Sequence, residues 1–228
     1  MNWLVLIVFL AIGTNSFGQS KARIAKSPTE FVPARYVVFG KIQGDLNGDN
    51  QADYILIIKG TDKGQFVKDE HRGELDRNRR GIIVALGSPN GYALALENRE
   101  CFSSENEDGG VYYAPELDVS IAKGNLRVHY AHGRYGYWTY SFRYRNSDFE
   151  LIGYDSSQDR GPVVERSTSI NLLTKKMRIR ENVNMNAEGG DERFRESWKK
   201  FTLVKPIRLR EIANFDDFDV QSLRGLRE

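Results

Sequence analysis

One segment alternates aromatic and polar side chains without a break, and this pattern constrains the fold more than any other feature of the chain. The aromatic residues are Trp138, Tyr140, Phe142 and Tyr144, and the polar residues between them are Thr139, Ser141, Arg143 and Arg145. Successive side chains of a β-strand point to opposite faces of the sheet. The segment is therefore predicted to be a strand that buries its aromatic face.

Short segments rich in β-branched and aromatic residues recur along the chain, bounded by Gly, Asn, Asp or Pro. The predicted strands are Tyr36–Ile42, Tyr54–Ile58, Gly81–Leu86, Tyr92–Glu97, Leu117–Ile121, Leu126–Tyr130, Phe149–Gly153, Ser169–Leu172, Met177–Arg180, Phe201–Val204 and Ile207–Leu209. Turn sequences such as Asn90-Gly91 favour hairpins between neighbours. We expect an all-β fold of antiparallel hairpins, arranged as a sandwich or as a partial propeller-like sheet, with few short helices.

Three further segments refine this expectation. Tyr54–Ile58 is apolar throughout, which predicts a strand covered on both faces. Thr61–Arg80 and Asn182–Glu196 are polar and are predicted to be solvated loops. Short helices are compatible with the sequence at Ser27–Phe31 or in the last residues. The sequence contains no internal repeat, so an array of copied blades is not supported.

The N-terminus carries an apolar run, Trp3–Ile12, that is too short for the roughly 20 residues of a membrane-spanning helix. Its length is typical of a secretory signal peptide, and the small residues Ser16 and Gly18 predict cleavage before Gln19. A buried core helix is the alternative, but such a helix should show a polar face. The predicted organisation is a signal peptide at 1–18, a single β domain at 19–218 and a C-terminal tail at 219–228. We therefore expect an exported, periplasmic or extracellular protein with no membrane span in the mature chain.

Charge and cysteine content exclude several classes of protein. The 33 basic and 31 acidic side chains give a net charge of +2, which provides no case for nucleic-acid or membrane-surface binding. Cys101 is the single cysteine, so no internal disulfide can form. It is interpreted as a small buried apolar group, because nothing near it in sequence supplies a base.

The segment Gly44–Asp53 carries the clearest chemical signal. Oxygen-bearing side chains fall at loop positions one, three, five and nine, occupied by Asp45, Asn47, Asp49 and Asp53. The backbone carbonyl of Gln51, at position seven, adds a further candidate ligand. Calcium prefers six to eight hard oxygen ligands and tolerates irregular geometry, whereas magnesium demands a stricter octahedron. The loop is therefore predicted to bind Ca²⁺ as a structural ion that joins two strands.

This loop resembles the calcium loop of FG-GAP and VCBS repeats, which occur in integrin α-subunit propellers and many bacterial surface proteins. The resemblance rests on Gly44–Asp49, on Asp53 and on the strand pattern that follows at once. Dockerin and EF-hand loops are also similar, but they are followed by a helix, and EF-hands carry glutamate at position twelve, where this chain has Leu56. Position six, usually glycine, is Asn50, a residue that tolerates left-handed backbone.

A wider likeness involves Gly109-Gly110, the aromatic strand and Asn146–Gly153. These elements resemble those of a group of uncharacterised bacterial exported proteins that carry one such loop. The resemblance implies no particular activity, and only the loop ligands carry over from it.

Two other groups are candidate sites. Tyr135 and Tyr137 lie beside Gly133 and Gly136, where aromatic rings on a flexed loop can stack on a sugar or a peptide. Covering the end of a hairpin is the alternative role for these rings. His129 and His132 can share a metal on a helix, but here they fall at a predicted strand end, so a polar rim is the favoured interpretation.

No catalytic motif is present, so we predict a non-catalytic, calcium-stabilised binding or interaction protein whose partner is a protein or a carbohydrate. Two alternatives stay open: a carbohydrate-active hydrolase whose carboxylate pair is formed only in space, and a structural envelope protein without a small ligand.

Overall fold

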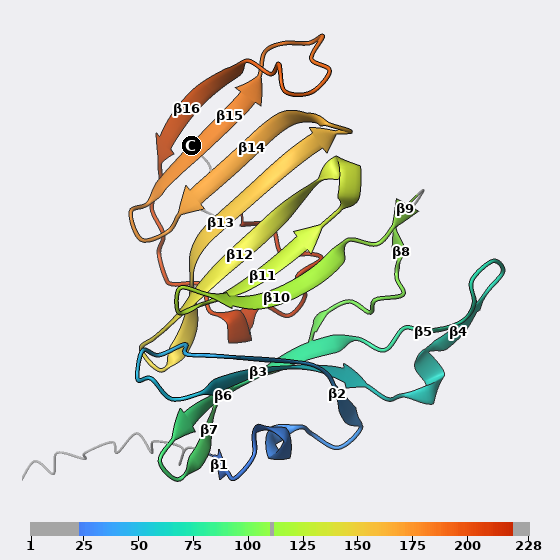
Figure 1. The fold of residues 1–228 in the computed structure, drawn as a ribbon, viewed down its shortest axis with the longest axis vertical. Coiled ribbons are helices and arrows are strands. Elements are labelled where there is room, and N and C mark those ends of the chain that lie inside the picture. The colour runs from blue at the N-terminus through green and yellow to red at the C-terminus, as the bar shows by residue number, and fades with distance from the viewer. Residues whose placement is uncertain (1–22, 110–111, 221–228) are drawn as a thin grey trace, which may run out of the picture.

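The computed structural model describes residues 23–109 and 112–220, and Figure 1 shows their arrangement. The predicted signal peptide and residues 221–228 of the predicted tail lie outside this part. The described chain is all-β, as predicted, with sixteen strands and four short 3₁₀ helices. Its sheets are antiparallel and the larger one is curled, consistent with a sandwich.

The first sheet has five strands in the order β1-β7-β6-β3-β2. Its members are β1 (Ile24–Ala25), β2 (Tyr36–Gly44), β3 (Asp53–Gly60), β6 (Arg80–Ser88) and β7 (Gly91–Phe102). The predicted Asn90-Gly91 turn joins β6 to β7, with Ser88 paired to Gly91. The predicted helix near Ser27 is the 3₁₀ helix η1 (Pro28–Phe31), capped by the Ser27 hydroxyl.

The second sheet has seven strands in sequential order, β10 to β16. They are β10 (Glu116–Ala122), β11 (Asn125–Ala131), β12 (Gly136–Arg145), β13 (Asp148–Arg160), β14 (Val163–Asn171), β15 (Lys176–Asn182) and β16 (Phe194–Lys200). The short helix η3 (Gly133–Tyr135) connects β11 to β12. Neighbouring strands pair antiparallel throughout, as the turn signals and strand patterns predict for β10 to β15.

The main hydrophobic core draws its side chains from both sheets. Ile55 and Ile57 of β3 belong to this core, whereas Leu56 and Ile58 belong to a smaller cluster that includes Phe31 of η1. The apolar Tyr54–Ile58 segment is therefore covered on both faces, which confirms the sequence prediction. On β12, the aromatic face is also inward, since Tyr140 and Phe142 are buried.

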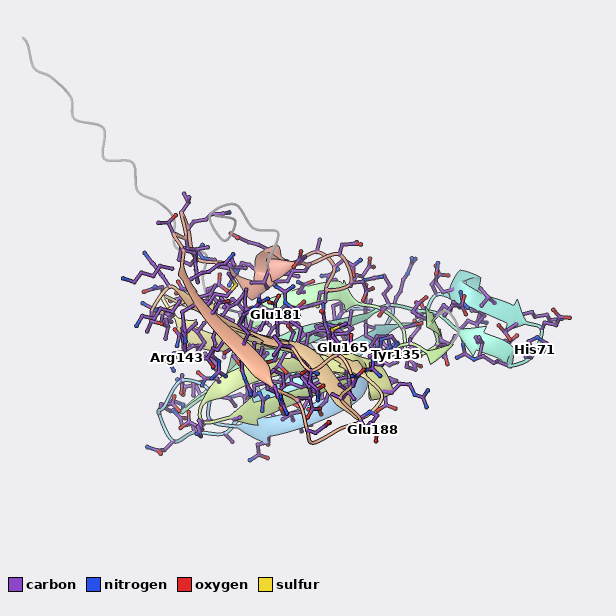
Figure 2. All side chains as sticks on the ribbon, turned by 90° about the horizontal axis from the view of Figure 1, so that it is seen from above. His71, Tyr135, Arg143, Glu165, Glu181 and Glu188 are labelled. Atoms are coloured by element: carbon purple, nitrogen blue, oxygen red, sulfur yellow. The ribbon has the colours of Figure 1, made fainter. Side chains whose placement is uncertain are left out.

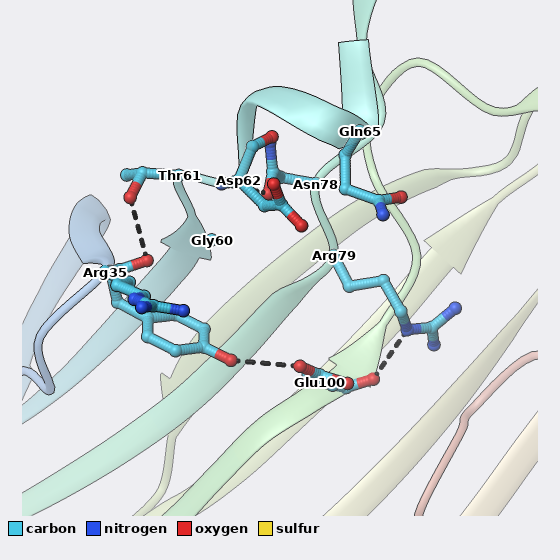
Figure 3. Close-up of a pocket in the computed structure, with 9 residues that line it drawn as sticks. Arg35, Gly60, Thr61, Asp62, Gln65, Asn78, Arg79 and Glu100 are labelled. Atoms are coloured by element: carbon cyan, nitrogen blue, oxygen red, sulfur yellow. Dashed lines mark hydrogen bonds between the residues drawn. The ribbon is translucent and has the colours of Figure 1, made fainter. Parts of the chain in front are cut away.

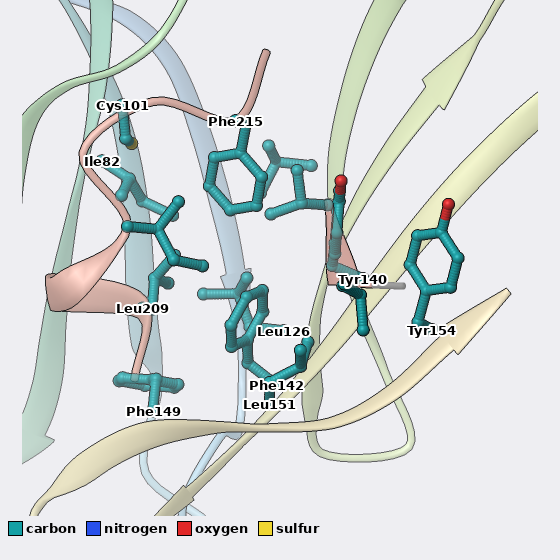
Figure 4. Close-up of a cluster of buried hydrophobic side chains, with 14 of the residues drawn as sticks. Ile82, Cys101, Leu126, Tyr140, Phe142, Phe149, Leu151, Tyr154, Leu209 and Phe215 are labelled. Atoms are coloured by element: carbon teal, nitrogen blue, oxygen red, sulfur yellow. The ribbon is translucent and has the colours of Figure 1, made fainter. Parts of the chain in front are cut away.

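The C-terminal segment, residues 201–220, packs into the core without forming a strand (Figure 4). Phe215 lies within ring-contact distance of Phe102 from the first sheet and of Tyr140 and Phe142 from the second. The Tyr140 hydroxyl donates a hydrogen bond of 2.9 Å to the Phe218 carbonyl. The segment thus joins the two sheets through side chains that both of them contact.

The predictions for the ends of the second sheet were wrong in two places. Phe201–Val204 and Ile207–Leu209 are not strands, apart from a single bridge between Glu150 and Arg208. Their apolar residues are explained by packing, since Leu209, in the 3₁₀ helix η4 (Leu209–Glu211), is fully buried. The predicted loop Asn182–Glu196 also contains the start of β16, whose side chains are mostly exposed.

The predicted loop Thr61–Arg80 contains helix η2 (Lys63–Gln65) and a hairpin of β4 (Phe66–Asp69) and β5 (Gly73–Asp76). This hairpin projects from the molecule, with His71 at its tip (Figures 1 and 2). A projecting hairpin buries little apolar surface, so its sequence lacks the alternation that marks a strand.

A further two-stranded ladder pairs β8 (Asp108–Gly109) with β9 (Tyr112–Tyr113). In the described residues, no helix has the length and apolar character needed to cross a membrane.

Candidate calcium loop and neighbouring cavities

The acidic loop lies between β2 and β3, with Gly44 and Asp53 paired across its base. Asp45 begins the loop, and both of its carboxylate oxygens accept backbone hydrogen bonds. Oδ1 accepts from Gly48 at 2.7 Å and from Asn47 at 3.3 Å, and Oδ2 accepts from Asn50 at 3.0 Å. These N–H groups, foremost that of Gly48, hold the pKa of Asp45 below its usual value. The anionic form of Asp45 therefore organises the first half of the loop.

The next two polar side chains repeat this arrangement along the loop. Asn47 Oδ1 accepts from the Asp49 N–H at 3.0 Å, and Asp49 Oδ1 accepts from the Gln51 N–H at 2.8 Å. The Asn47 amide also donates to Asp49 Oδ2 at 2.9 Å. Asn50 has a φ of +63°, so the left-handed conformation expected at position six is present. Oxygens on alternate residues are thus fixed by local backbone contacts.

Asp53 differs from the other loop carboxylates because it is fully buried. Its Oδ2 accepts from the Leu46 N–H at 2.7 Å, and its Oδ1 accepts from the Gly87 N–H in β6 at 2.8 Å. Burial raises the pKa of Asp53, and the charges of Asp49 and Asp45 raise it further, against the effect of the two N–H donors. Asp53 therefore ties the loop to the sheet, but no cationic side chain among the described residues forms an ion pair with it to offset its charge.

The donor set of the loop is chemically suited to a hard cation. All five predicted ligands are oxygens: the carboxylates of Asp45, Asp49 and Asp53, the amide oxygen of Asn47 and the carbonyl of Gln51. Across the residues that the structure describes, no three His, Cys, Asp or Glu side chains are grouped so as to hold a metal. Calcium binding by this loop thus stays a prediction.

The two candidate ligand-binding tyrosines line different cavities. Tyr135 lies 5.2 Å from His132, ring to ring, and lines a mainly apolar cavity of about 290 Å³ near the start of β10. Figure 2 shows its position on the ribbon. Tyr137 lines a cavity of about 380 Å³ on the outward face of the second sheet, which we call the polar cleft. The fold therefore does not bring the two rings together into one stacking surface.

The histidines and the cysteine occupy separate environments. His129 Nδ1 and the Thr139 hydroxyl share a hydrogen bond of 2.7 Å, consistent with a polar role on the strand. Nε2 of His132 is buried and has no hydrogen-bond partner among the described residues. Cys101 is fully buried, and burial raises the pKa of its thiol, so the interpretation as a buried apolar group is confirmed.

Sequence reasoning missed a polar cavity of about 350 Å³ at the base of the projecting hairpin (Figure 3). Arg35 and Arg79 line it from segments far apart in the chain, together with Tyr36 and Glu100. The Tyr36 hydroxyl donates to Glu100 Oε1 at 3.1 Å, and Arg79 Nε donates to the Glu100 carbonyl at 2.9 Å. No spacing in the sequence links these residues, because only the pairing of β2, β3, β6 and β7 brings them together.

Comparison with known proteins adds no relative to these observations. No model of a known protein family matches the sequence, and neither a curated protein nor a solved structure is significantly similar to it.

Proposed function

We propose that the chain is an exported, calcium-stabilised β domain that acts as a non-catalytic binding protein. The observation that carries the proposal is the loop between β2 and β3, where alternate residues present oxygens that backbone N–H groups hold in place. A preorganised loop of hard oxygens loses less conformational entropy when it takes up an ion. The ion would be structural, because it would join two strands of the core sheet.

The electrostatics of Asp53 support an ion at this position. A buried carboxylate near two other acidic side chains is unfavourable in its charged form. A divalent cation held by Asp45, Asn47, Asp49, the Gln51 carbonyl and Asp53 would compensate that charge, which is why metal binding is expected to add to folding stability. Millimolar calcium outside the cytoplasm would be sufficient for a weak site.

The test is thermal unfolding with calcium and with chelator. Calcium at about ten times its Kd adds about 1.4 kcal/mol, which corresponds to about 3–6 °C in Tm for a domain of this size. Asp49→Ala should abolish that increase. Asp69→Ala is the matched control, because Asp69 caps the β4–β5 turn by the same kind of contact, accepting the N–H groups of His71 and Arg72. A wild-type Tm that is equal in calcium and chelator would remove the metal from the proposal.

Export has an independent test. Mass spectrometry of the protein secreted by its host should give an N-terminus at or near Gln19. Recovery of the chain with Met1 intact would show that the apolar run Trp3–Ile12 is not a cleaved signal. This result would leave the calcium measurement unaffected.

A further inference from the structure

The outward face of the second sheet forms a polar cleft that crosses several strands. Its floor contains the hydroxyls of Ser157 in β13 and of Ser167 and Ser169 in β14. Ser157 pairs with Ser167, so their side chains lie side by side on one face. Its volume of about 380 Å³ is within the range of small-molecule sites. The sheet therefore presents a row of hydroxyl groups in a hollow of ligand size.

Two arginines beside this floor are held by aromatic rings and by no carboxylate. Arg180 lies 4.0 Å from the centroid of Phe194, and Arg178 lies 5.9 Å from that of Trp198. Among the described residues, neither guanidinium takes part in an ion pair or a hydrogen bond. Stacking fixes the plane of a guanidinium while leaving its N–H donors available. The cleft thus offers oriented donors next to its hydroxyl floor.

The opposite wall supplies acceptors and an aromatic surface. Asp155 is exposed and pairs with Ser169 in the strand register, and Tyr137 pairs with Ser157. Tyr137 is 39% exposed, and its ring lies 5.5 Å from that of His129, which supports it from one side. An exposed aromatic ring next to donors and acceptors is suited to a ligand that has both apolar faces and hydroxyl groups.

The charge of the cleft excludes polyanionic ligands. Three carboxylates line it against two guanidiniums, which gives a formal charge of −1. Two of the carboxylates already have protein partners: Asp159 contacts the Ser157 hydroxyl, and Glu192 accepts the N–H groups of Val164 and Gly190. A nucleic acid or a sulfated glycan would be repelled, because such ligands require a net positive surface.

A peptide is disfavoured by the position of the cleft. Extended peptides usually bind at a sheet edge, where their backbone groups complete the ladder. This cleft lies on the face of β12 to β15, whose backbone groups are already paired with neighbouring strands. From β12 to β15 it spans three inter-strand steps, or about 14 Å, which favours a ligand longer than one ring.

We infer that the polar cleft binds a short neutral oligosaccharide, with Tyr137 stacking on a sugar ring and with Asp155, Arg178 and Arg180 bonding to its hydroxyls. This inference names a ligand class for the binding role proposed above and rests on that role, but it does not depend on the calcium loop.

The test is a glycan array of neutral, sulfated and sialylated oligosaccharides, with a set of peptides screened in parallel. Calorimetry then follows with the neutral glycan that gives the strongest signal. Tyr137→Ala and Arg178→Ala should each weaken binding at least about tenfold, as truncation of a central interface residue commonly does. The matched controls, Phe66→Ala and Arg195→Ala, should retain wild-type affinity. Phe66 lies on the projecting hairpin, and Arg195 pairs with Glu181 on the other face of the sheet.

The inference would be overturned if no neutral glycan bound at millimolar concentration, or if only charged glycans or peptides bound. It would also be overturned if both cleft variants bound the neutral glycan as tightly as wild type. Calorimetry is repeated in calcium and in chelator, so that failure of the loop and failure of the cleft are separate results. Mass spectrometry of the glycan after incubation checks for cleavage. Cleaved product would confirm the site while overturning the non-catalytic role.

Discussion

At the scale of single residues, the most informative group is the buried carboxylate of Asp53. It accepts one N–H from the acidic loop and one from β6, so it holds three parts of the chain in register. A buried charge of this kind is costly, and its raised pKa reflects that cost. Local backbone geometry also matters here, since Gly48 and Asn50 both have positive φ. The loop is thus organised by hydrogen bonds to acidic oxygens as much as by turn propensity.

Asp53→Asn should lower the free energy of unfolding by about 1–3 kcal/mol in chelator. Both partners of Asp53 are N–H donors, so the new amide would place its own NH₂ group against one of them. Urea unfolding measures the change. Asp118→Asn, at an exposed position on β10, is the control and should stay within about 0.5 kcal/mol of wild type. A variant as stable as wild type would mean that the two hydrogen bonds contribute nothing.

At the scale of elements, the hairpins were predictable wherever one face of a strand is buried and a turn signal follows it. The alternation on β12 and the Asn90-Gly91 turn are examples. The projecting β4–β5 hairpin and β16 were missed because their exposed side chains leave no apolar pattern. The ligands of the candidate loop are adjacent in sequence and were therefore recognisable. The polar cleft was not, because its residues come together only through strand pairing.

Two glycines near the C-terminal end of β13 allow backbone strain to be distinguished from steric contact: Gly161 follows β13, and Gly136, the first residue of β12, pairs with Gln158. Gly161 has a φ of +64° with open space around it, whereas a Cβ on Gly136, at φ +110°, would lie 2.0 Å from the Ser157 carbonyl oxygen. Gly161→Ala should cost about 1–2 kcal/mol through backbone strain alone. Gly136→Ala should cost more, because β12 and β13 would have to separate. Equal losses in chemical denaturation would show that the hairpin accommodates the methyl group freely.

The base of the projecting hairpin depends on an ionised Asp76. Burial raises the pKa of Asp76, but hydrogen bonds from Lys59 and Asn78 outweigh that effect and hold the pKa below its usual value. Asp76 contacts the buried Lys59 Nζ at 2.8 Å. Because the folded-state pKa of Asp76 is depressed, its ionised form stabilises the fold. This stabilisation is complete above the unfolded-state pKa of about 3.9 and is lost as the pH falls through the folded-state pKa.

Asp76→Asn should therefore be less stable than wild type at neutral pH, and the difference should shrink as the pH falls below about 4. Urea unfolding of both proteins across this range measures the difference, in which the other titrating groups largely cancel. The Asp118→Asn control, at an exposed position, should show only a small difference from wild type. A constant gap between Asp76→Asn and wild type would show that the ionised form of Asp76 is not what stabilises the hairpin.

At the scale of the whole molecule, the two sheets form one hydrophobic core, and the C-terminal segment connects them. Phe215 is 2% exposed and contacts rings from both sheets, and its N–H donates to the Cys101 carbonyl at 2.9 Å. The strand patterns at Phe201–Val204 and Ile207–Leu209 did not place it correctly, because its burial depends on a space that exists only after both sheets have formed. A shared core of this kind predicts that the sheets unfold together.

Phe215→Ala should lower the free energy of unfolding by about 3–5 kcal/mol, because it leaves a cavity where the two sheets meet. The loss should appear equally in both sheets, so hydrogen exchange should accelerate by the same factor for the buried amides of β3 and β6 and for those of β12 and β13. Phe66→Ala, at a side chain that is 44% exposed, is the control and should change neither. Faster exchange in one sheet alone would show that the sheets are separate cooperative units, and the C-terminal segment would then be an appendage of that sheet.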